Sequence, residues 1–197
     1  MNMTSIENHI RAILQEIGEN PSREGLVDTP KRVAKMYTEL FRGYDKSQKP
    51  VVTTFPNGVD GVAYDEMVMD FGSVHSQCEH HMLPFSGHYW FGYIPSLKGK
   101  VLGLSKVARV VDYFAAKLQI QERLVHEIVT CLLDALSKNG AEPPLGLALV
   151  IRAEHLCKTM RGVKKQGVMT TSKMTGLFLD KDDSARHEFL SFVSKDI

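Results

Sequence analysis

The sequence is poor in three features that would place it in a specialised class: long apolar runs, an excess of charge of one sign, and cysteine. No hydrophobic run approaches the ~18 residues that a membrane-spanning helix needs, which excludes an integral membrane protein. The 24 Lys and Arg residues are balanced by 23 Asp and Glu residues, so a net charge of +1 gives no general attraction to nucleic acid or membranes. Any preference for anions must therefore be local.

The scarcity of cysteine and the plain N-terminus bear on the cellular compartment. Three cysteines, an odd number, argue against a disulfide framework and favour metal or thiol roles. Residues 1–5 show neither a basic region nor an apolar segment, so we expect no signal peptide and a cytoplasmic location. The 197 residues suit one main domain, and we place an N-terminal helical segment at 1–45 before a domain at 46–197.

The spacing of apolar residues predicts both helices and strands, which indicates an α+β chain. Apolar positions three and four apart, together with cap residues, predict helices over 6–17, 29–43, 105–118, 121–140 and 184–193. Alternating or β-branched and aromatic residues predict strands over 66–74, 86–94, 145–157 and 168–178. We expect a loop with one short strand over 46–63, and we expect Cys131 to be a core residue on its helical stripe.

Cysteine and histidine gather between the first two predicted strands, at Cys78, His80 and His81. Cys78 and His81 are three apart, so a single helical turn brings thiolate and imidazole to one side, where both can bind one ion. His80 then points elsewhere. His155 and Cys157 appear far downstream, two residues apart, and an extended segment would place both on one face.

These residues predict a metal site with an open position. Cys78, His81 and Cys157 are three ligands of the soft kind that favours zinc, and three protein ligands leave a coordination position for water, as in catalytic zinc sites. We interpret His80 and His155 as proton donors, because histidine titrates near neutral pH. The alternative is that either histidine closes the shell, which would make the chain a structural-zinc binding or scaffold module.

Basic residues stand in the first turns of two predicted helices, where they oppose the helix dipole and so need another explanation. Arg32 follows one helix start, and Lys106 and Arg109 follow the Ser105 cap on one face. Free backbone N–H groups and added positive charge together are what a phosphate group prefers. Arg161 lies four residues after Cys157, so the pattern indicates a polyphosphate substrate beside the metal site.

Gln121 and Glu122 begin another predicted helix. A glutamate in the first turn is favourable for the helix dipole alone. A carboxylate can also accept two N–H bonds from the edge of a guanine base. The residues by themselves leave both readings of Glu122 open.

Taken together, these segments resemble the GTP cyclohydrolase I family. The matching stretches are Asp28–Tyr37, Cys78–His81, Tyr93–Pro95, Gly103–Lys106 with Arg109, Gln119–Leu124, and His155–Cys157 with Arg161–Val163. They follow one another in order over most of residues 28–178. So many spaced motifs make the resemblance specific.

The resemblance implies a fold and an assembly. The fold is the tunnelling fold, in which an antiparallel sheet with paired helices joins those of other subunits into a β-barrel ring. The usual assembly is a homodecamer of two stacked pentamers with active sites at subunit interfaces. Residues 46–197 would then be the catalytic domain, and neither nucleic acid nor a membrane would be a partner.

The resemblance also implies a role for each candidate residue. The zinc ligands would be Cys78, His81 and Cys157, and the proton donors and acceptors would be His80 and His155. Glu122 would anchor the guanine, helped by backbone around Ile120 and Gln121. Four basic residues would clamp the triphosphate, with Ser105 close to the ribose or phosphate: Arg32, Lys106, Arg109 and Arg161.

The implied reaction is the hydrolysis and rearrangement of GTP to 7,8-dihydroneopterin triphosphate, with C8 of the guanine released as formate. Another pterin or purine enzyme of the same fold is the remaining alternative, disfavoured because it would not need Cys78, His81 and Cys157 together. The sequence leaves open whether the product feeds folate, biopterin or deazapurine synthesis, and it leaves Glu79 without a role.

Overall fold

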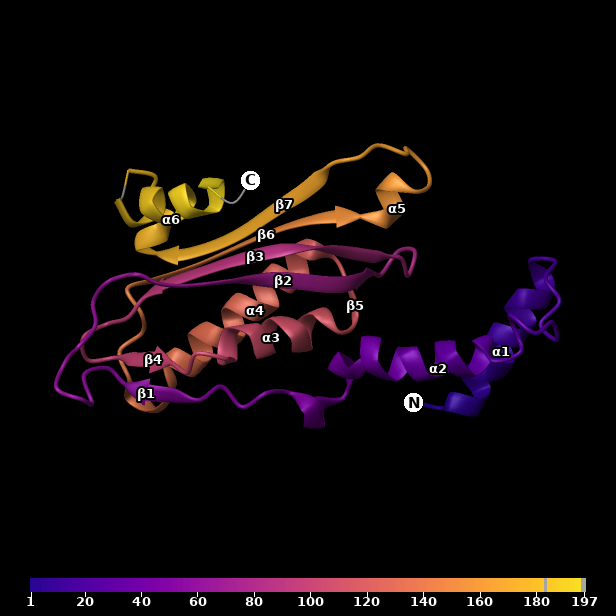
Figure 1. Ribbon diagram of the computed structural model, residues 1–197. Helices are drawn as coiled ribbons and strands as arrows, with labels where there is room; N and C mark the ends of the chain where they lie inside the picture. The colour runs from indigo at the N-terminus through magenta and orange to yellow at the C-terminus, as the bar shows by residue number, and fades with distance from the viewer. Residues whose placement is uncertain (183, 196–197) are drawn as a thin grey trace.

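The computed structural model, which describes residues 1–182 and 184–195, is built on one twisted five-stranded sheet (Figure 1). Its strand order is β5-β2-β3-β6-β7, antiparallel except where the short β5 lies parallel to β2. The strands are β2 (Val68–Cys78), β3 (Pro84–Ile94), β5 (Leu118–Gln119), β6 (Gly146–His155) and β7 (Val168–Gly176). A separate pair joins β1 (Thr54–Pro56) to β4 (Lys100–Leu102). The α+β class predicted from the sequence is confirmed.

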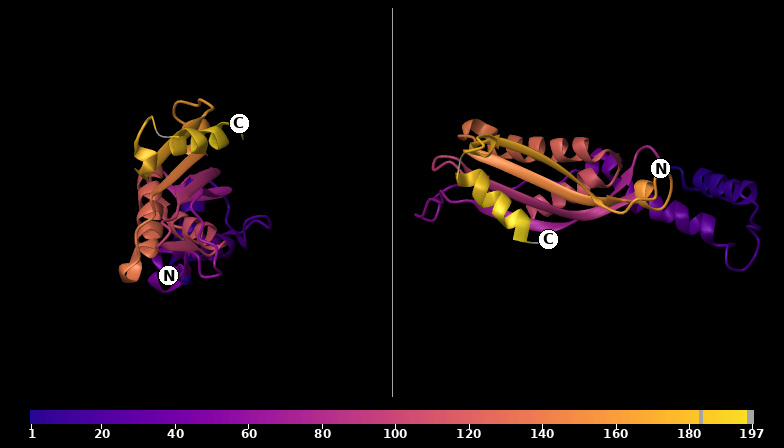
Figure 2. Two further views of the ribbon diagram at one scale, coloured as in Figure 1. Left: turned by 90° about the vertical axis from the view of Figure 1, so that its left-hand side faces the viewer. Right: turned by 90° about the horizontal axis from the view of Figure 1, so that it is seen from above.

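Two helices, α3 (Lys106–Ala115) and α4 (Gln121–Leu136), pack against one face of the sheet, and α6 (Ser184–Lys195) covers part of the other (Figures 1 and 2). Alternate residues of β6 therefore enter two different cores: Leu149 and Ile151 pack on the α3 and α4 side, and Val150 packs on the α6 side. Each such side chain contributes roughly 1.5–3 kcal/mol on full burial. The central strands β3 and β6 are thus the firmest support for a site at their ends.

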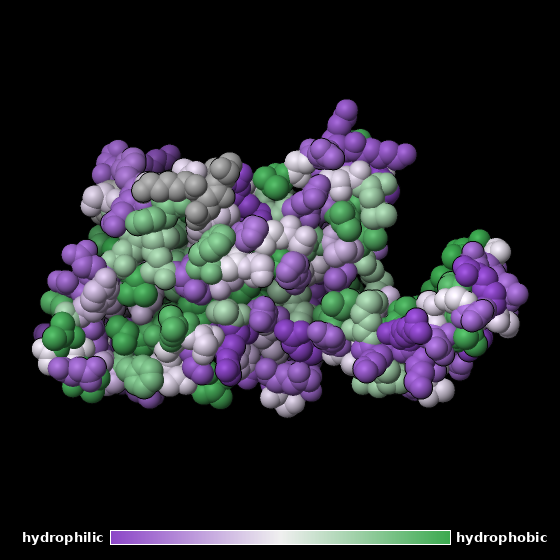
Figure 3. All heavy atoms as spheres, viewed as in Figure 1, coloured by the Kyte–Doolittle hydropathy of each residue, from purple (hydrophilic) through white to green (hydrophobic). Residues whose placement is uncertain are grey.

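The first two helices, α1 (Met3–Glu16) and α2 (Thr29–Leu40), form an arm that projects from the sheet domain (Figures 1 and 3). The predicted apolar stripe of α1 is present, but none of its residues is buried, and Ile13 and Ile17 are exposed. The arm joins the domain at the short helix η1 (Arg42–Tyr44), where the Gly43 N–H donates to Ala116 O at 2.8 Å. A side chain at Gly43 would collide with the backbone oxygens of Tyr113 and Ala116.

Most predicted elements are present with shifted ends. Helix α2 begins at Thr29, with Asp28 as the residue before it. Strand β2 runs on to Cys78 instead of ending near 74, because β3 pairs with it as far as Gln77. Short 3₁₀ turns occupy Lys46–Gln48, Lys138–Gly140 and Leu177–Leu179. No helix within the described residues is both long and apolar enough to cross a membrane.

One prediction about the site is wrong. The strand expected over 145–157 ends at His155, and Cys157 lies in the short helix α5 (Leu156–Thr159). In the β3–β6 ladder, His155 pairs with Phe85. The next residue of β3 in that direction is Pro84, which has no N–H to donate, so the ladder stops there. His155 and Cys157 therefore do not share a strand face. The predicted alternation holds for His155, which lies on the same face of β6 as the helix-facing residues Ile151 and Ala153.

Candidate active site

The candidate site lies where the β2–β3 hairpin turns and β6 ends. The Met82 N–H donates to Cys78 O at 2.8 Å, so one helical-type turn follows the end of β2, as the spacing of Cys78 and His81 predicts. A second bond, from Cys78 N–H to Leu83 O at 2.8 Å, closes the hairpin. Met82 completes the turn with φ of 55°, a left-handed conformation that is costly for a side chain with a Cβ. The two hydrogen bonds therefore hold the turn in a conformation that is costly for Met82.

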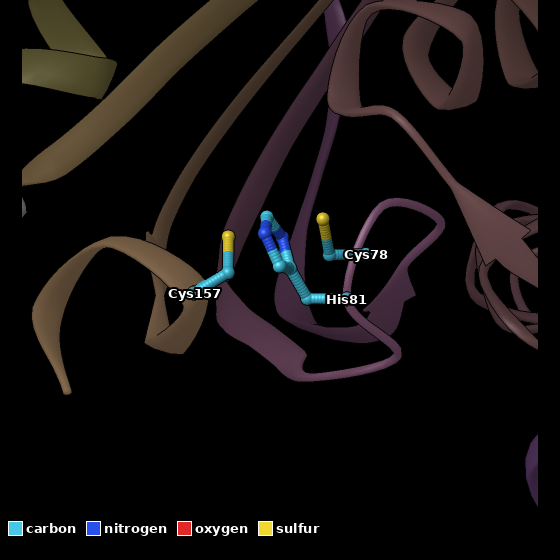
Figure 4. Close-up of side chains that lie close together, drawn as sticks. All are labelled: Cys78, His81 and Cys157. Carbon is cyan, nitrogen blue, oxygen red and sulfur yellow. The ribbon is translucent and has the colours of Figure 1, made fainter. Parts of the chain in front are cut away.

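Three side chains converge beside this turn. Ligand atoms of Cys78, His81 and Cys157 all lie within 4.8 Å of one another, and Figure 4 shows the two sulfurs and the imidazole directed into the same space. Zinc binds sulfur at ~2.3 Å and nitrogen at ~2.0 Å, so its ligand atoms stand roughly 3.5–4 Å apart. The cluster needs little contraction to hold the ion. Cys78 is buried and His81 is exposed, which leaves one side open to solvent.

The protonation of the thiols is consistent with a cation site. Burial raises the pKa of the Cys157 thiol, and the hydrogen bond and charge of the neighbouring Cys78 raise that pKa further. A divalent cation would compensate the negative charge of a Cys157 thiolate. The donor set of two sulfurs and one imidazole fits zinc.

The two remaining histidines stand beside the cluster without joining it. Nδ1 of His80 lies 3.7 Å from Sγ of Cys78. Nε2 of His155 lies 2.8 Å from Oε1 of Gln121. Within the described part of the chain, the group with metal-binding geometry comprises Cys78, His81 and Cys157 and includes neither His80 nor His155. This arrangement favours an open site over a closed structural one.

His155 is held in a partly buried pocket. Its ring stacks on Phe85 with centroids 4.5 Å apart and planes 10° from parallel. Burial lowers the pKa of the imidazole; the Glu122 carboxylate opposes this shift, and Lys158 adds slightly to it. His155 is therefore biased toward its neutral form while it stays close to a carboxylate.

Arg161 reaches the metal cluster directly. Its Nη1 lies 2.8 Å from Nε2 of His81, although the two residues are 80 positions apart in the sequence. The exposed loop after α5 carries it there. The predicted phosphate ligand Arg161 and the metal ligand His81 are thus neighbours within one chain.

Gln121 and Glu122 open α4 but face in opposite directions. The Gln121 side chain is buried. The Glu122 side chain is exposed and is near enough to His155 for its charge to act on that imidazole. The predicted guanine anchor therefore lies next to the predicted proton donor.

The other predicted phosphate ligands lie farther from the metal cluster than Arg161 does. The C-terminal end of α3 touches β2 near the site, because Ser76 Oγ donates to Ala115 O at 2.7 Å. Lys106 begins the same helix nine residues earlier, roughly 13 Å farther along at 1.5 Å per residue. Ser105 directly precedes Lys106, and Arg109 lies in the first turn of the same helix. Arg32 lies on the projecting arm, paired at 3.4 Å with Asp28 on the surface.

One interaction was missed by the sequence reasoning. The Glu79 carboxylate pairs with the Arg123 guanidinium, whose Nε also donates to Gln119 Oε1 at 2.8 Å. The Glu79 N–H donates to Gln119 O at 3.0 Å. These bonds join the turn after Cys78 to the first turn of α4. The partners are 44 residues apart, and no local pattern connects them.

Comparisons with a family model and with known proteins all point to the same family. Residues 6–194 match the family model of GTP cyclohydrolase I. GTP cyclohydrolase 1 of Thermoanaerobacter pseudethanolicus is 45% identical over 190 residues, covering 96% of this chain and 95% of that protein. The Bacillus pumilus enzyme of the same name is 45% identical over 199 residues, covering 100% and 98% of the two chains. That of Coxiella burnetii (strain Dugway 5J108-111) is 44% identical over 194 residues, covering 97% and 98%.

Proposed function

The chain belongs to the GTP cyclohydrolase I family and is a hydrolase acting on the purine ring of GTP, and we propose that it uses zinc and releases formate. The observation that carries this proposal is the convergence of Cys78, His81 and Cys157 within 4.8 Å, with an exposed side. Zinc held by these three residues would act as a Lewis acid and make water a strong nucleophile near neutral pH.

The proposed reaction converts GTP and water to 7,8-dihydroneopterin triphosphate and formate. Water adds at C8 of the guanine, the imidazole ring opens, and C8 leaves as formate before the ribose rearranges and the new ring closes. His80 and His155 exchange the protons that these steps require, N7 of the purine being the first to receive one. The stacked, partly buried ring of His155 keeps this group in place for the transfer.

The substrate is proposed to lie between two kinds of contact. Glu122 accepts N–H bonds from the guanine edge, next to His155, and this orients C8 toward the metal cluster. Arg161 binds the triphosphate from the same chain, because it already reaches His81. We assign Lys106, Arg109, Ser105 and Arg32 to the triphosphate and ribose as well, but supplied by a neighbouring copy.

A ring of subunits would supply those residues. The sheet has two edges open to pairing: β2 meets β5 only at Gln77 and Cys78, and β7 pairs with β6 on one side among the described residues. Open edges are templates for strands of another chain. We propose the homodecameric tunnelling-fold ring, with sites at its interfaces, the catalytic domain at 46–197 and the helical segment at 1–45. We also propose a cytoplasmic location, which suits this small-molecule substrate.

The test is incubation of the protein with GTP, with and without a chelator, while formate and the fluorescent neopterin formed on oxidation of the product are assayed. We expect both to appear, and chelation to stop them while circular dichroism and assembly persist. Added zinc should restore them. Full turnover in metal-free protein would contradict the zinc proposal, and unfolding on chelation would favour a structural metal.

A further inference from the structure

The Gln121 side chain is 1% exposed, and all of its polar atoms have partners. Its amide nitrogen Nε2 lies 3.0 Å from Ile151 O, 3.1 Å from Met169 O and 2.9 Å from Thr171 Oγ1. Two of these three neighbours are carbonyl oxygens, which can only accept. An inverted amide would set Oε1 against both carbonyls, so the network fixes which end of the amide is nitrogen.

The fixed amide determines the proton on His155. Oε1 of Gln121 can only accept a hydrogen bond, and it lies 2.8 Å from Nε2 of His155. Nε2 must therefore carry hydrogen. A neutral imidazole has a single N–H, so Nδ1 is then bare. Stacking on Phe85, 10° from parallel, holds the plane of the ring that makes this bond.

We propose that Gln121 is a positioning residue that holds His155 as its Nε2–H tautomer, so that Nδ1 is the nitrogen that exchanges protons with the substrate. This inference rests on the proposed role of His155 in proton transfer. Nδ1 takes a proton as His155 acts as a base and gives it up as His155 acts as an acid. Nε2 keeps its hydrogen bond to Gln121 throughout.

A purely structural role for Gln121 is the competing explanation, because its bonds also join α4 to β6 and β7. Thr171→Val is a matched control. It removes one acceptor of the Gln121 nitrogen, while the two carbonyls still fix the amide and the bond to His155 remains. Gln121→Met keeps a similar volume but removes the acceptor for His155.

The first measurement separates kcat from KM for neopterin formation in the zinc-loaded enzyme, with metal content and thermal unfolding recorded for each variant. For Gln121→Met we expect kcat to fall at least tenfold, short of the ~10²–10⁴-fold typical of losing a general acid–base group, with KM for GTP and zinc content unchanged. Thr171→Val should lower thermal stability and leave kcat unchanged. A wild-type kcat in Gln121→Met, or equal losses of kcat in both variants, would overturn the proposal.

The second measurement is solid-state nuclear magnetic resonance of sedimented zinc-loaded enzyme containing ¹⁵N-labelled histidine, with His155→Ala used to assign the resonances. We expect a protonated Nε2 and a bare Nδ1 for His155 in the wild type and in Thr171→Val, and loss of that pattern in Gln121→Met. A wild-type ring protonated at Nδ1 and bare at Nε2 would overturn the proposal, even if Gln121→Met did not fold. Full turnover by His155→Ala would instead refute the proposed role of His155, independently of the tautomer observed.

Discussion

The residues of the metal cluster meet within one chain, whereas most of the basic residues at helix starts lie away from that cluster. Cys78, His81 and Cys157 come from two distant parts of the sequence and still meet within 4.8 Å. Lys106 and Arg32 lie near the starts of helices, at the ends away from this point, one along the sheet and one on the projecting arm. A single chain thus brings the three candidate metal ligands together, whereas most of the proposed phosphate ligands would, in the proposed ring, serve another copy.

The difference follows from what supports each region. The cluster stands at the ends of β2, β3 and β6, whose register is set by continuous ladders and by two buried cores. Such strand ends are rigid, which suits groups that must meet within tenths of an ångström. Charge contacts to a flexible triphosphate tolerate more variation, and an interface can supply them.

Cys157→Ala should have the largest effect. It removes one of the three proposed ligands, and without the metal the pKa of water rises far above neutral, so turnover should fall by ~10⁴-fold or more. Formate release and zinc content measure this. Cys131→Ala is the control: burial raises the pKa of the Cys131 thiol, which packs partly against the core. It should keep its zinc and lose only about 1 kcal/mol of stability. Retention of zinc and turnover by Cys157→Ala would remove Cys157 from the site.

His80→Ala and His155→Ala should keep zinc and lose turnover by ~10²–10⁴-fold, the usual contribution of a general acid–base group. Neopterin fluorescence and metal content, read on the same samples, test both halves of this expectation. His126→Ala, on the exposed side of α4, is the matched control and should behave as the wild type. Loss of zinc from His80→Ala would show that His80 is a ligand and that the site is closed.

Lys106→Ala should raise KM for GTP by roughly 10–100-fold, because a hydrogen bond to a charged group contributes ~1.5–3 kcal/mol. Lys98→Ala, in an exposed loop, should not. The stronger test mixes Lys106→Ala with Cys157→Ala during assembly. If neighbours complete each other's sites, about a quarter of the sites in a random mixed ring are intact, and activity reappears at low GTP. Absence of recovery in proven mixed rings would place Lys106 in the site of its own chain.

Glu122→Gln should have the smallest effect on catalysis and the clearest one on selection. The amide can accept one N–H bond but offers a donor where the second guanine N–H lies, so preference for GTP over ATP should fall by roughly tenfold. Competition between the two nucleotides at the zinc-loaded enzyme measures this. Unchanged discrimination would leave Glu122 with only its favourable place in the first turn of α4.

The sequence predicted residue types better than their placement. The three-residue spacing of Cys78 and His81 was enough, because one local turn brings them together. Cys157 was selected correctly as a member of the cluster by its chemistry, but for the wrong local reason: it lies on α5, and the end of the β3 ladder at Pro84 decides that. Alternation predicted the inward face of His155 correctly.

Long-range contacts could not be predicted in this way. Glu79 and Arg123 meet only because β5 lies parallel to the end of β2. The burial of Gln121 depends on the register of β6 with β7, which brings Ile151 O and Thr171 to the start of α4. The basic residues at helix starts were recognised by their charge, but charge alone does not place them relative to the metal cluster.

The close backbone contact at Gly43 is the point about which the arm would turn relative to the sheet domain. Arg32 stands 11 residues before this contact, about 16 Å away if the chain were helical throughout. A rotation of ~10° at the contact would then carry Arg32 through about 3 Å, the length of a hydrogen bond. Glycine at position 43 allows the two backbone segments to come into contact, whereas a side chain there would push them apart. The position of the distant Arg32 guanidinium therefore depends on the close backbone approach that Gly43 allows.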